Sequence, residues 1–192
     1  MLDAITGKSS LRDFISTTLL KDCSSVFASV IVRLENLSFA EGLFPIPFKT
    51  AQVTPIVNKT GFETSNPASY RPISNLNTIN KVLKRLFLAK LIPHVSPSIC
   101  PLQSEYRQFH STETVLLKIV NDLFEAAESG CVTVLVALDL SAAFNTIDHQ
   151  VLVRRLEHTF GVKGPALSWA KSYIEGCSCF VKVSNAMSTT LS

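Results

Sequence analysis

The chain has 192 residues, 46% of them hydrophobic, with a net charge of +3 and a mean hydropathy of +0.27. This length suits one domain or one and a half small ones, and the composition excludes an intrinsically disordered chain. No apolar run approaches the roughly 18 residues of a membrane span, and the N-terminal residues lack the apolar stretch of a signal peptide.

The five cysteines form no Cys-x-x-Cys pair, and no nearby histidine completes a zinc set. We therefore expect free thiols in a reducing compartment. The chain is predicted to be intracellular, nuclear or cytoplasmic, and to have no membrane partner. The small net charge separates no class of partner by itself.

Helices are predicted first, because apolar residues recur at helical spacing over residues 11–20 and 26–37. Gly42 is expected to end the second helix. Residues 49–57 are typical of a short strand. Pro55 cannot donate to a ladder, so this strand is predicted to be an edge or bulged strand.

A basic helix is predicted next, capped by Asn77 or Thr78. Just before it, Pro72 forces an extended conformation on Arg71. The apolar face of the helix carries Ile79, Val82, Leu83, Leu86 and Leu91. Its other face carries Lys81, Lys84, Arg85 and Lys90. Such a face is either a solvated surface or a contact for nucleic acid.

Ser111 is predicted to cap a further helix, with Glu113 in its first turn and its end near Gly130. The remaining predicted elements are helices over residues 150–160 and 165–175, and a strand over residues 179–183 that begins a hairpin.

The stretch Cys131–His149 organises the rest. Val132–Leu138 is short, apolar and β-branched, which predicts a strand buried on both faces. Asp139 stands at its end, either as a capping or strand-end carboxylate or as an oxygen ligand for a hard cation. The small residues after it would let the backbone of Leu140–Ala143 approach a phosphate, while Phe144 walls a neighbouring pocket.

Four ordered segments resemble the reverse transcriptases of non-LTR (LINE-type) retrotransposons. The stretch VALDLSAAFNTIDH is similar to that family's motif A, L-D-L-S-x-A-F-D-x-[IV]-D-H. The other similar segments are FPIPFKTAQVTPIVNK with YRPISNLNTINKVLKRL, YRQFHSTETVLL, and GVKGPALSWAKSYIEG. The resemblance runs from about residue 19 to residue 183.

This resemblance implies an α+β fold, a partial right-hand polymerase with fingers and the first part of the palm, mostly helical with a small sheet. The implied divisions are an N-terminal helical extension (1–44), a fingers-like region (45–130) and a partial palm with motif A (131–192). Family enzymes extend a DNA primer on an RNA template with deoxynucleoside triphosphates and two Mg²⁺ ions. The implied partners are therefore template, primer, dNTP and a missing C-terminal palm or thumb segment.

The resemblance also implies roles for single residues. Asp139 would be the catalytic carboxylate and hold both metal ions, and the Leu140 carbonyl would complete one metal shell. Phe144 resembles the steric gate against a ribose 2′-hydroxyl, and Arg71 a fingers residue near the incoming nucleotide. The further nucleotide-binding positions are Ser141, Ala142, Ala143 and Lys59, the last with the alternative of a solvated loop lysine.

Departures from the family pattern qualify these roles. The chain contains no [FY]-x-D-D pair and no Gly-Pro-Gln-Gly motif. One carboxylate does not hold two divalent ions well, so we expect the chain to be inactive alone. The alternatives are a non-catalytic nucleic-acid-binding module and a decayed fragment with no selected role. Single residues also depart from the family pattern. Asn145 stands where the family has Asp, Glu105 and Gln108 stand where it has Gly and Pro, and Asn58 stands where it often has Lys.

Other polar and aromatic residues receive structural interpretations. His110 is expected to bond within its loop, and Asp148 and His149 to cap the helix that follows. Trp169 and Tyr173 are expected to pack in the core. The exposed edges of the strands Val132–Leu138 and Cys179–Val183 predict poor solubility.

Overall fold

A computed structural model describes residues 13, 15–57, 65–140, 143 and 146–191. The described chain divides into two compact units. Unit 1 comprises residues 1–94 and 149–192, and unit 2 comprises residues 95–148. Among the described helices, none is long and apolar enough to cross a membrane.

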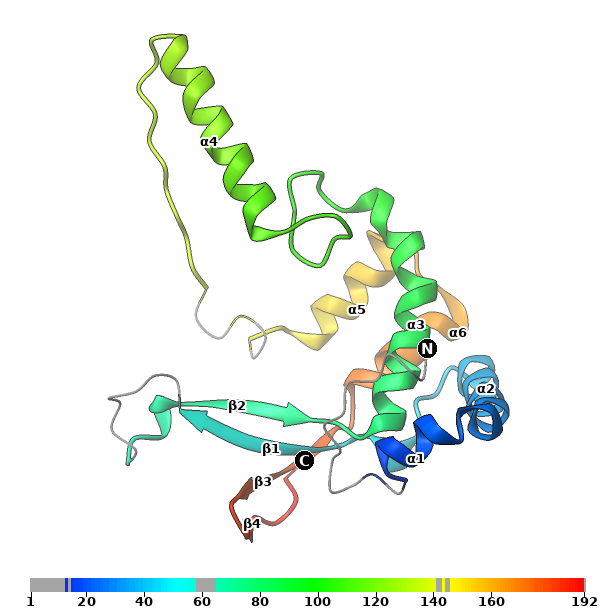
Figure 1. The fold of residues 1–192 in the computed structure, drawn as a ribbon. Helices are drawn as coiled ribbons and strands as arrows, with labels where there is room; N and C mark the ends of the chain where they lie inside the picture. Colours follow the sequence, from blue (N-terminus) through cyan, green and yellow to red (C-terminus); the bar gives the residue numbers. More distant parts are fainter. Residues whose placement is uncertain (1–12, 14, 58–64, 141–142, 144–145, 192) are drawn as a thin grey trace. The chain divides into compact units, whose positions relative to one another are not determined.

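A four-stranded sheet with the order β2-β1-β3-β4 runs through unit 1 (Figure 1). The strands are β1 (Thr50–Val57), β2 (Tyr70–Asn75), β3 (Ser178–Val183) and β4 (Ala186–Met187). β1 pairs antiparallel with β2 and parallel with β3, and β3 turns back onto β4. The mixture of helices with one small sheet agrees with the predicted α+β class.

Two prolines face each other in the part of the sheet where β1 pairs with β2 but no longer with β3. Pro55 of β1 stands opposite Pro72 of β2. β3 accompanies β1 only from Thr50 to Val53, so Pro55 lies beyond the end of that parallel pairing. A proline amide has no hydrogen to donate, and here β1 has an edge on the β3 side. β1 is therefore an interior strand in its first half and an edge strand at Pro55, as the proline predicted.

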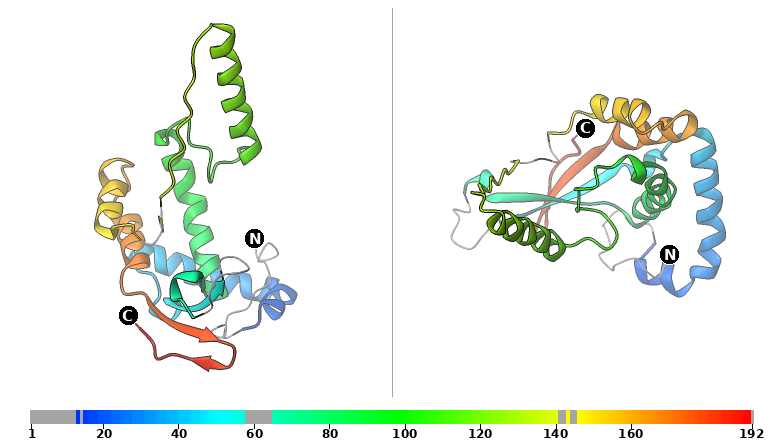
Figure 2. Two further views of the ribbon diagram at one scale, coloured as in Figure 1. Left: turned by 90° about the vertical axis from the view of Figure 1, so that its left-hand side faces the viewer. Right: turned by 90° about the horizontal axis from the view of Figure 1, so that it is seen from above.

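Helices complete unit 1 (Figure 2). They are α1 (Thr17–Asp22), α2 (Ser24–Glu41), α3 (Thr78–Val95), α5 (His149–His158) and α6 (Gly164–Ile174). Unit 1 also has short 3-10 helices at Ile46–Phe48 and Pro67–Ser69, and unit 2 has one at Ser96–Ser98. These bounds confirm the predicted helices and their order. The predicted start of the first helix at residue 11 lies outside the described residues.

Gly42 ends α2, as predicted, and there are two reasons why this position needs a residue without a side chain. Its φ of 66° is the left-handed conformation that favours glycine. A Cβ atom at this position would also lie 2.9 Å from Cβ of Ser168 and 3.1 Å from the carbonyl oxygen of Pro165, both on α6. The turn after α2 can therefore approach α6 closely only without a side chain.

Aromatic side chains form the centre of unit 1. Trp169 is 1% exposed and stacks on Phe87 of α3, with ring centroids 4.3 Å apart. The ring of Tyr173 is also stacked with that of Trp169, with centroids 5.5 Å apart, and Phe44 meets both of these rings edge-on. The indole nitrogen of Trp169 donates to the Ser38 hydroxyl at 2.8 Å, so its polar atom is satisfied. Trp169 and Tyr173 are packing residues, as predicted.

The start of α3 is held by residues far away in sequence. The Thr78 amide donates to the carboxylate of Asp13 at 2.6 Å, and the hydroxyls of Thr17 and Thr78 lie 3.3 Å apart. The Asn80 amide donates to Oδ1 of Asn77 at 2.7 Å, so Asn77, the residue directly before the helix, caps the first turn of α3, as predicted. The N-terminus of α3 is therefore fixed by Asp13, which precedes α1, and by the first residue of α1.

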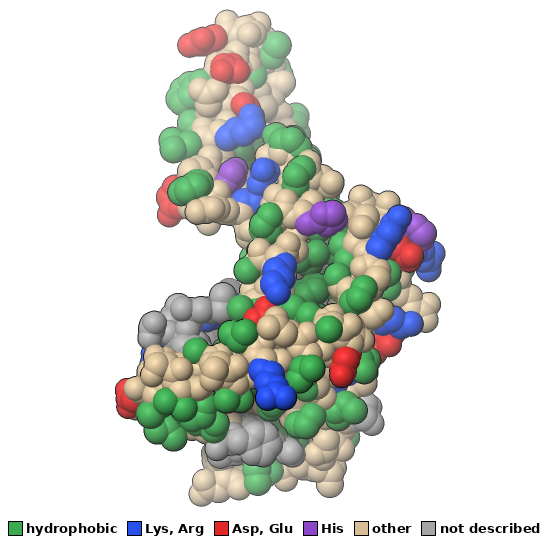
Figure 3. All heavy atoms as spheres, turned by 90° about the vertical axis from the view of Figure 1, so that its right-hand side faces the viewer, with side chains coloured by type: hydrophobic (Ala, Val, Ile, Leu, Met, Phe, Trp, Pro, Cys, Tyr) green, Lys and Arg blue, Asp and Glu red, His purple; other side chains and the backbone are tan. Residues whose placement is uncertain are grey.

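Unit 2 contains α4 (Thr112–Glu128), a loop of turns before it and an extended segment after it. Ser111 caps α4 in a capping box with Thr114, as the sequence predicted. The Ser111 hydroxyl also lowers the pKa of Glu113 in the first turn. Hydrophobic side chains lie in the open on this helix (Figure 3). Leu117 is 70% exposed and Phe124 is 67% exposed.

The predicted central strand Val132–Leu138 is the main correction. Residues 131–140 form no strand in the structure, and all of them are exposed. Val132 is 95% exposed and Leu138 91% exposed. The apolar, β-branched composition indicated a strand buried on both faces, but a strand also needs neighbours to complete its ladder. The described sheet does not include this segment.

Candidate functional site

Asp139, the predicted catalytic carboxylate, lies on the extended segment between α4 and α5. This segment leaves α4 through Gly130, whose φ is 69°, and the Cys131 amide closes the turn onto the Ala126 carbonyl at 2.9 Å. Asp139 is exposed, so its carboxylate is open to solvent. The prediction that it ends a buried strand is therefore wrong, since no described strand leads to it.

The residues after Asp139 were predicted to contact a nucleotide, and the structure describes some of them. The Leu140 side chain is 78% exposed. Ala143 is also exposed, and its carbonyl accepts a hydrogen bond from the Thr146 hydroxyl at 3.2 Å. The predicted contacts Ser141, Ala142 and Phe144 lie outside the described residues, as does Lys59.

Arg71, the predicted fingers residue, lies on β2 of unit 1. It stands opposite Ile56 in the antiparallel ladder, next to Pro72, and its side chain is exposed. Its backbone is extended, as the following proline predicted. Arg71 therefore belongs to unit 1, whereas Asp139, Leu140 and Ala143 belong to unit 2.

The metal-ligating capacity of the described residues falls short of a two-ion site. No group of three or more His, Cys, Asp or Glu side chains comes together in the part of the chain that the structure describes. Asp139 supplies one carboxylate, whereas Mg²⁺ takes six ligands and each ion of a pair needs charge balance. The described residues alone do not fit a pair of Mg²⁺ ions.

The basic face of α3 is partly used within the protein. The ammonium of Lys81 donates to Oδ1 of Asn75 at 3.1 Å, and that of Lys90 pairs with the Glu35 carboxylate at 2.9 Å. Burial lowers the pKa of Lys81, Asp13 opposes this shift, and the cations Lys84 and Arg85 add to it. Two of the predicted cations of this face are therefore bound to neighbouring side chains.

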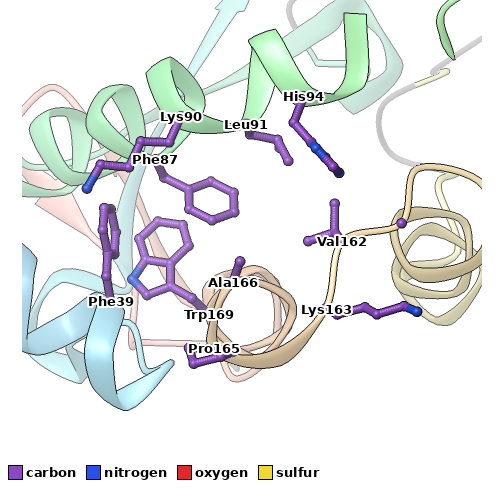
Figure 4. Close-up of a pocket in the computed structure, with 11 residues that line it drawn as sticks. Phe39, Phe87, Lys90, Leu91, His94, Val162, Lys163, Pro165, Ala166 and Trp169 are labelled. Atoms are coloured by element: carbon purple, nitrogen blue, oxygen red, sulfur yellow. The ribbon is translucent and has the colours of Figure 1, made fainter. Parts of the chain in front are cut away.

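A cavity of about 510 Å³ lies beside the aromatic core of unit 1 (Figure 4). The rings of Phe39, Phe87 and Trp169 gather along one wall, and Lys90 extends beside them. The Lys90 ammonium lies 4.6 Å from the centre of the Phe39 ring, and Nε2 of His94 lies 2.8 Å from the carbonyl oxygen of Phe160. Sequence reasoning missed this cavity, and the helical spacing of Phe87 and Leu91 was its one visible signal.

Further predictions about single residues agree with the structure. His110 bonds within its loop, with Nδ1 3.0 Å from the carbonyl oxygen of Gln108. α5 begins at His149, directly after Asp148, so the helix starts where it was predicted, and the capping role of these two residues stays a prediction. All five cysteines are free.

Comparison with known proteins places these features in a family. The family described as reverse transcriptase (RNA-dependent DNA polymerase) matches residues 57–191. The chain is 31% identical over 152 residues to the RNA-directed DNA polymerase from mobile element jockey of Drosophila melanogaster, covering 78% of this chain and 16% of that protein. It is also 31% identical over 163 residues to the probable RNA-directed DNA polymerase from transposon X-element of the same species, covering 84% and 17%.

A more distant relative is the Pol polyprotein from type-1 retrotransposable element R2 of Popillia japonica, 26% identical over 122 residues and covering 64% of this chain. The chain spans about a sixth of the length of the curated relatives that it matches. Because the family match covers well over half of the chain, this protein belongs to the reverse transcriptase family and is related to the RNA-directed DNA polymerases of non-LTR retrotransposons.

Proposed function

We propose that this chain forms the fingers and the first part of the palm of an RNA-directed DNA polymerase. In this proposal residues 1–44 are a helical extension, residues 45–130 the fingers-like region and residues 131–192 the partial palm. The substrates of the complete enzyme are an RNA template, a DNA primer and deoxynucleoside triphosphates. Asp139 is one carboxylate of a two-magnesium site, and other carboxylates must complete that site.

The observation that carries this proposal is the order of residues around Asp139. Asp139 follows an apolar β-branched run and precedes a small-residue stretch and Phe144, as in motif A of the family. The exposure of Asp139, Leu140 and Ala143 supports it, because a group that binds metal or nucleotide must be reachable. We assign Phe144 as the gate against ribonucleotides, and Arg71 with Lys59 as contacts for the triphosphate.

We further infer that the 192 residues do not extend a primer by themselves. They contain no adjacent pair of aspartates, and their described acidic residues form no cluster. Two divalent ions need more oxygen ligands than one carboxylate supplies.

A chimera tests the proposal. The segment of the jockey protein that follows its matched region is fused behind residue 192, and extension of a primer on RNA is measured with Mg²⁺. The chimera is expected to extend the primer, and the chain alone is not. Asp139→Asn in the chimera should lower the rate at least about 100-fold, or about 2.7 kcal/mol in activation free energy.

Asp122→Asn is the matched control, because Asp122 is an exposed carboxylate of α4 that pairs with Lys118 at 3.0 Å. This variant should retain the activity of the chimera. Activity that survives Asp139→Asn would contradict the role of Asp139. Mg²⁺-dependent extension by the unfused chain, abolished by Asp139→Asn, would contradict the inferred inactivity.

A second candidate function is a nucleic-acid-binding module without catalysis. The observation that favours it is the uneven distribution of charge. Unit 1 contains 16 of the 18 Lys and Arg residues but only 8 of the 15 Asp and Glu residues, a net charge of +8. A concentration of cations in one compact unit is the electrostatic footprint of phosphate binding. Binding of single-stranded RNA that weakens steeply with salt would support this function.

A further inference from the structure

The loop before α4 is held in one conformation by a single arginine. Nη1 of Arg107 donates toward three backbone carbonyls, those of Cys100 at 3.2 Å, Pro101 at 3.1 Å and Gln103 at 3.2 Å. These carbonyls lie four to seven residues before Arg107, so its guanidinium closes the loop onto itself. Two turns, from Ser104 to Arg107 and from Arg107 to His110, continue the loop toward α4.

Two aromatic residues of this loop have an uncommon backbone conformation. Tyr106 has a φ of 60° and Phe109 a φ of 64°, in the left-handed region that bulky side chains rarely occupy. Neither side chain is buried in return, because Tyr106 is 78% and Phe109 90% exposed. The strained backbone of these two residues is therefore not offset by burial of their side chains. Residues with strained backbones are kept where the surrounding structure imposes the conformation, and they cluster at binding sites.

A groove of about 420 Å³ lies between this loop and the first turns of α4. Its apolar walls include Leu102 and Phe109 of the loop and Val115 and Ile119 of α4. Leu102 is itself 74% exposed. The groove therefore has room for one or two apolar side chains of another molecule.

The charge of unit 2 selects the kind of occupant. The unit has two cations, Arg107 and Lys118, against seven Asp and Glu residues, a net charge of −5. Both cations are already engaged, Arg107 by the carbonyls and Lys118 by Asp122 at 3.0 Å. A nucleic acid would meet net repulsion from this unit. An apolar segment flanked by lysine or arginine would meet charge complementarity.

We propose that residues 99–110 and the start of α4 form a docking groove for a protein segment with apolar anchors and basic flanks, and that Arg107 is the positioning residue of this groove. The proposal goes beyond polymerase function and does not depend on it. Arg107 acts through the backbone of the loop, whereas Leu102 and Phe109 contact the anchors.

Two fluorescein-labelled peptides test the occupant by fluorescence anisotropy with the full chain. Both have a central Leu-Phe-Leu, one with lysines on each side and the other with glutamates. The lysine-flanked peptide should bind at least about ten-fold more tightly than the other. Phe109→Gly should weaken it about ten-fold, because glycine keeps the positive φ but removes the anchor contact. Leu138→Ala, at another exposed leucine of unit 2, is the control and should leave the affinity unchanged.

Several outcomes would overturn the docking groove. These are no binding of either peptide, equal binding of both, or an equal loss of affinity in Leu138→Ala and Phe109→Gly. A labelled oligothymidylate that bound more tightly than the peptides, and lost its affinity in Phe109→Gly, would reassign the loop to nucleic acid.

Limited digestion with chymotrypsin tests the positioning role of Arg107. Tyr106 and Phe109 are exposed cleavage sites that a rigid loop protects, and Arg107→Gln should speed cleavage there several-fold. Cleavage within unit 1 is the internal reference and should keep its rate. Arg107→Lys should restore part of the protection and part of the peptide affinity, because an ammonium also donates to carbonyls. Unchanged cleavage and unchanged affinity in Arg107→Gln would overturn the role.

Discussion

At the scale of single residues, Tyr173 connects the aromatic core to a buried polar group. Its ring stacks on Trp169, and its hydroxyl lies 3.4 Å from Oδ1 of Asn80. Burial, with a smaller contribution from Cys177, raises the pKa of Tyr173 from 10.0 to about 12. The folded state therefore favours the neutral phenol.

This shift predicts a loss of stability in strong alkali. The contribution of Tyr173 is complete below pH 10, the ordinary pKa of the phenol, and is lost as the pH rises toward 12. The free energy of unfolding in urea should fall more steeply between these pH values in the unmodified chain than in Tyr173→Phe. The tyrosinate absorbance that this substitution removes should titrate near pH 12 in the folded chain and near pH 10 in urea. If the absorbance difference between the unmodified chain and Tyr173→Phe titrated near pH 10 in both the folded and the unfolded state, the prediction would be contradicted.

Single residues were also where sequence reasoning succeeded most clearly. Gly42 and Ser111 mark helix ends through local chemistry, and the structure has helix termini at both of them. The cap of α3 by Asp13 was not predictable, because it joins residues 65 positions apart. Local rules cannot supply a partner that only the tertiary fold brings near.

At the scale of elements, the helices and the strands β1 and β3 followed their sequence patterns, whereas β2 was predicted only as an extended Arg71. The parallel pairing of β1 with β3 did not appear in any local signal, since it joins Thr50 to Ser178. The prediction for residues 132–138 was wrong for the opposite reason, because the local sequence pattern strongly indicated a strand and the structure has none there. Periodicity reports what a segment prefers, whereas a ladder depends on neighbouring strands. The predicted site inherited this error, because Asp139 was placed at the end of that strand.

The segment 132–138 is expected to drive self-association. Its apolar side chains are exposed, with Val134 at 80% and Val136 at 71%, and no described strand covers its backbone. Exposed β-prone segments of low charge pair with copies of themselves. Val134→Lys should hinder this self-association. The concentration at which light scattering and thioflavin T fluorescence begin to increase should therefore rise several-fold.

Leu117→Lys is the matched control, because Leu117 is 70% exposed but lies within α4, whose backbone is already hydrogen-bonded. It should have a smaller effect than Val134→Lys. A chain that stays monomeric and melts cooperatively at high concentration would contradict the expectation.

At the scale of the whole molecule, the division of charge between the units determines how RNA binding should respond to salt. Each phosphate neutralised on a single strand contributes a slope of about −0.7 in log K against log salt. Arg71→Ala should therefore weaken RNA binding and reduce the slope by about 0.7. Arg71 is exposed on β2 of the positively charged unit.

Lys118→Ala provides the comparison, because Lys118 pairs with Asp122 in the negatively charged unit. It should leave both the affinity and the slope unchanged. Affinity that is the same at low and physiological salt would contradict the binding function, as would equal effects of the two substitutions.

The long-range pairing of β1 also has a consequence for synthesis on the ribosome. Thr50 bonds to Ser178, and the Phe44 amide donates to the Ser172 hydroxyl, each across 128 residues of chain. At 5–20 residues per second, β1 waits roughly 6 to 25 s before β3 is made. During this interval β1 has only β2 as its partner, while unit 2, which is encoded within the gap, can already fold. A chaperone would therefore be expected to bind the nascent chain during this interval, while β1 still lacks β3.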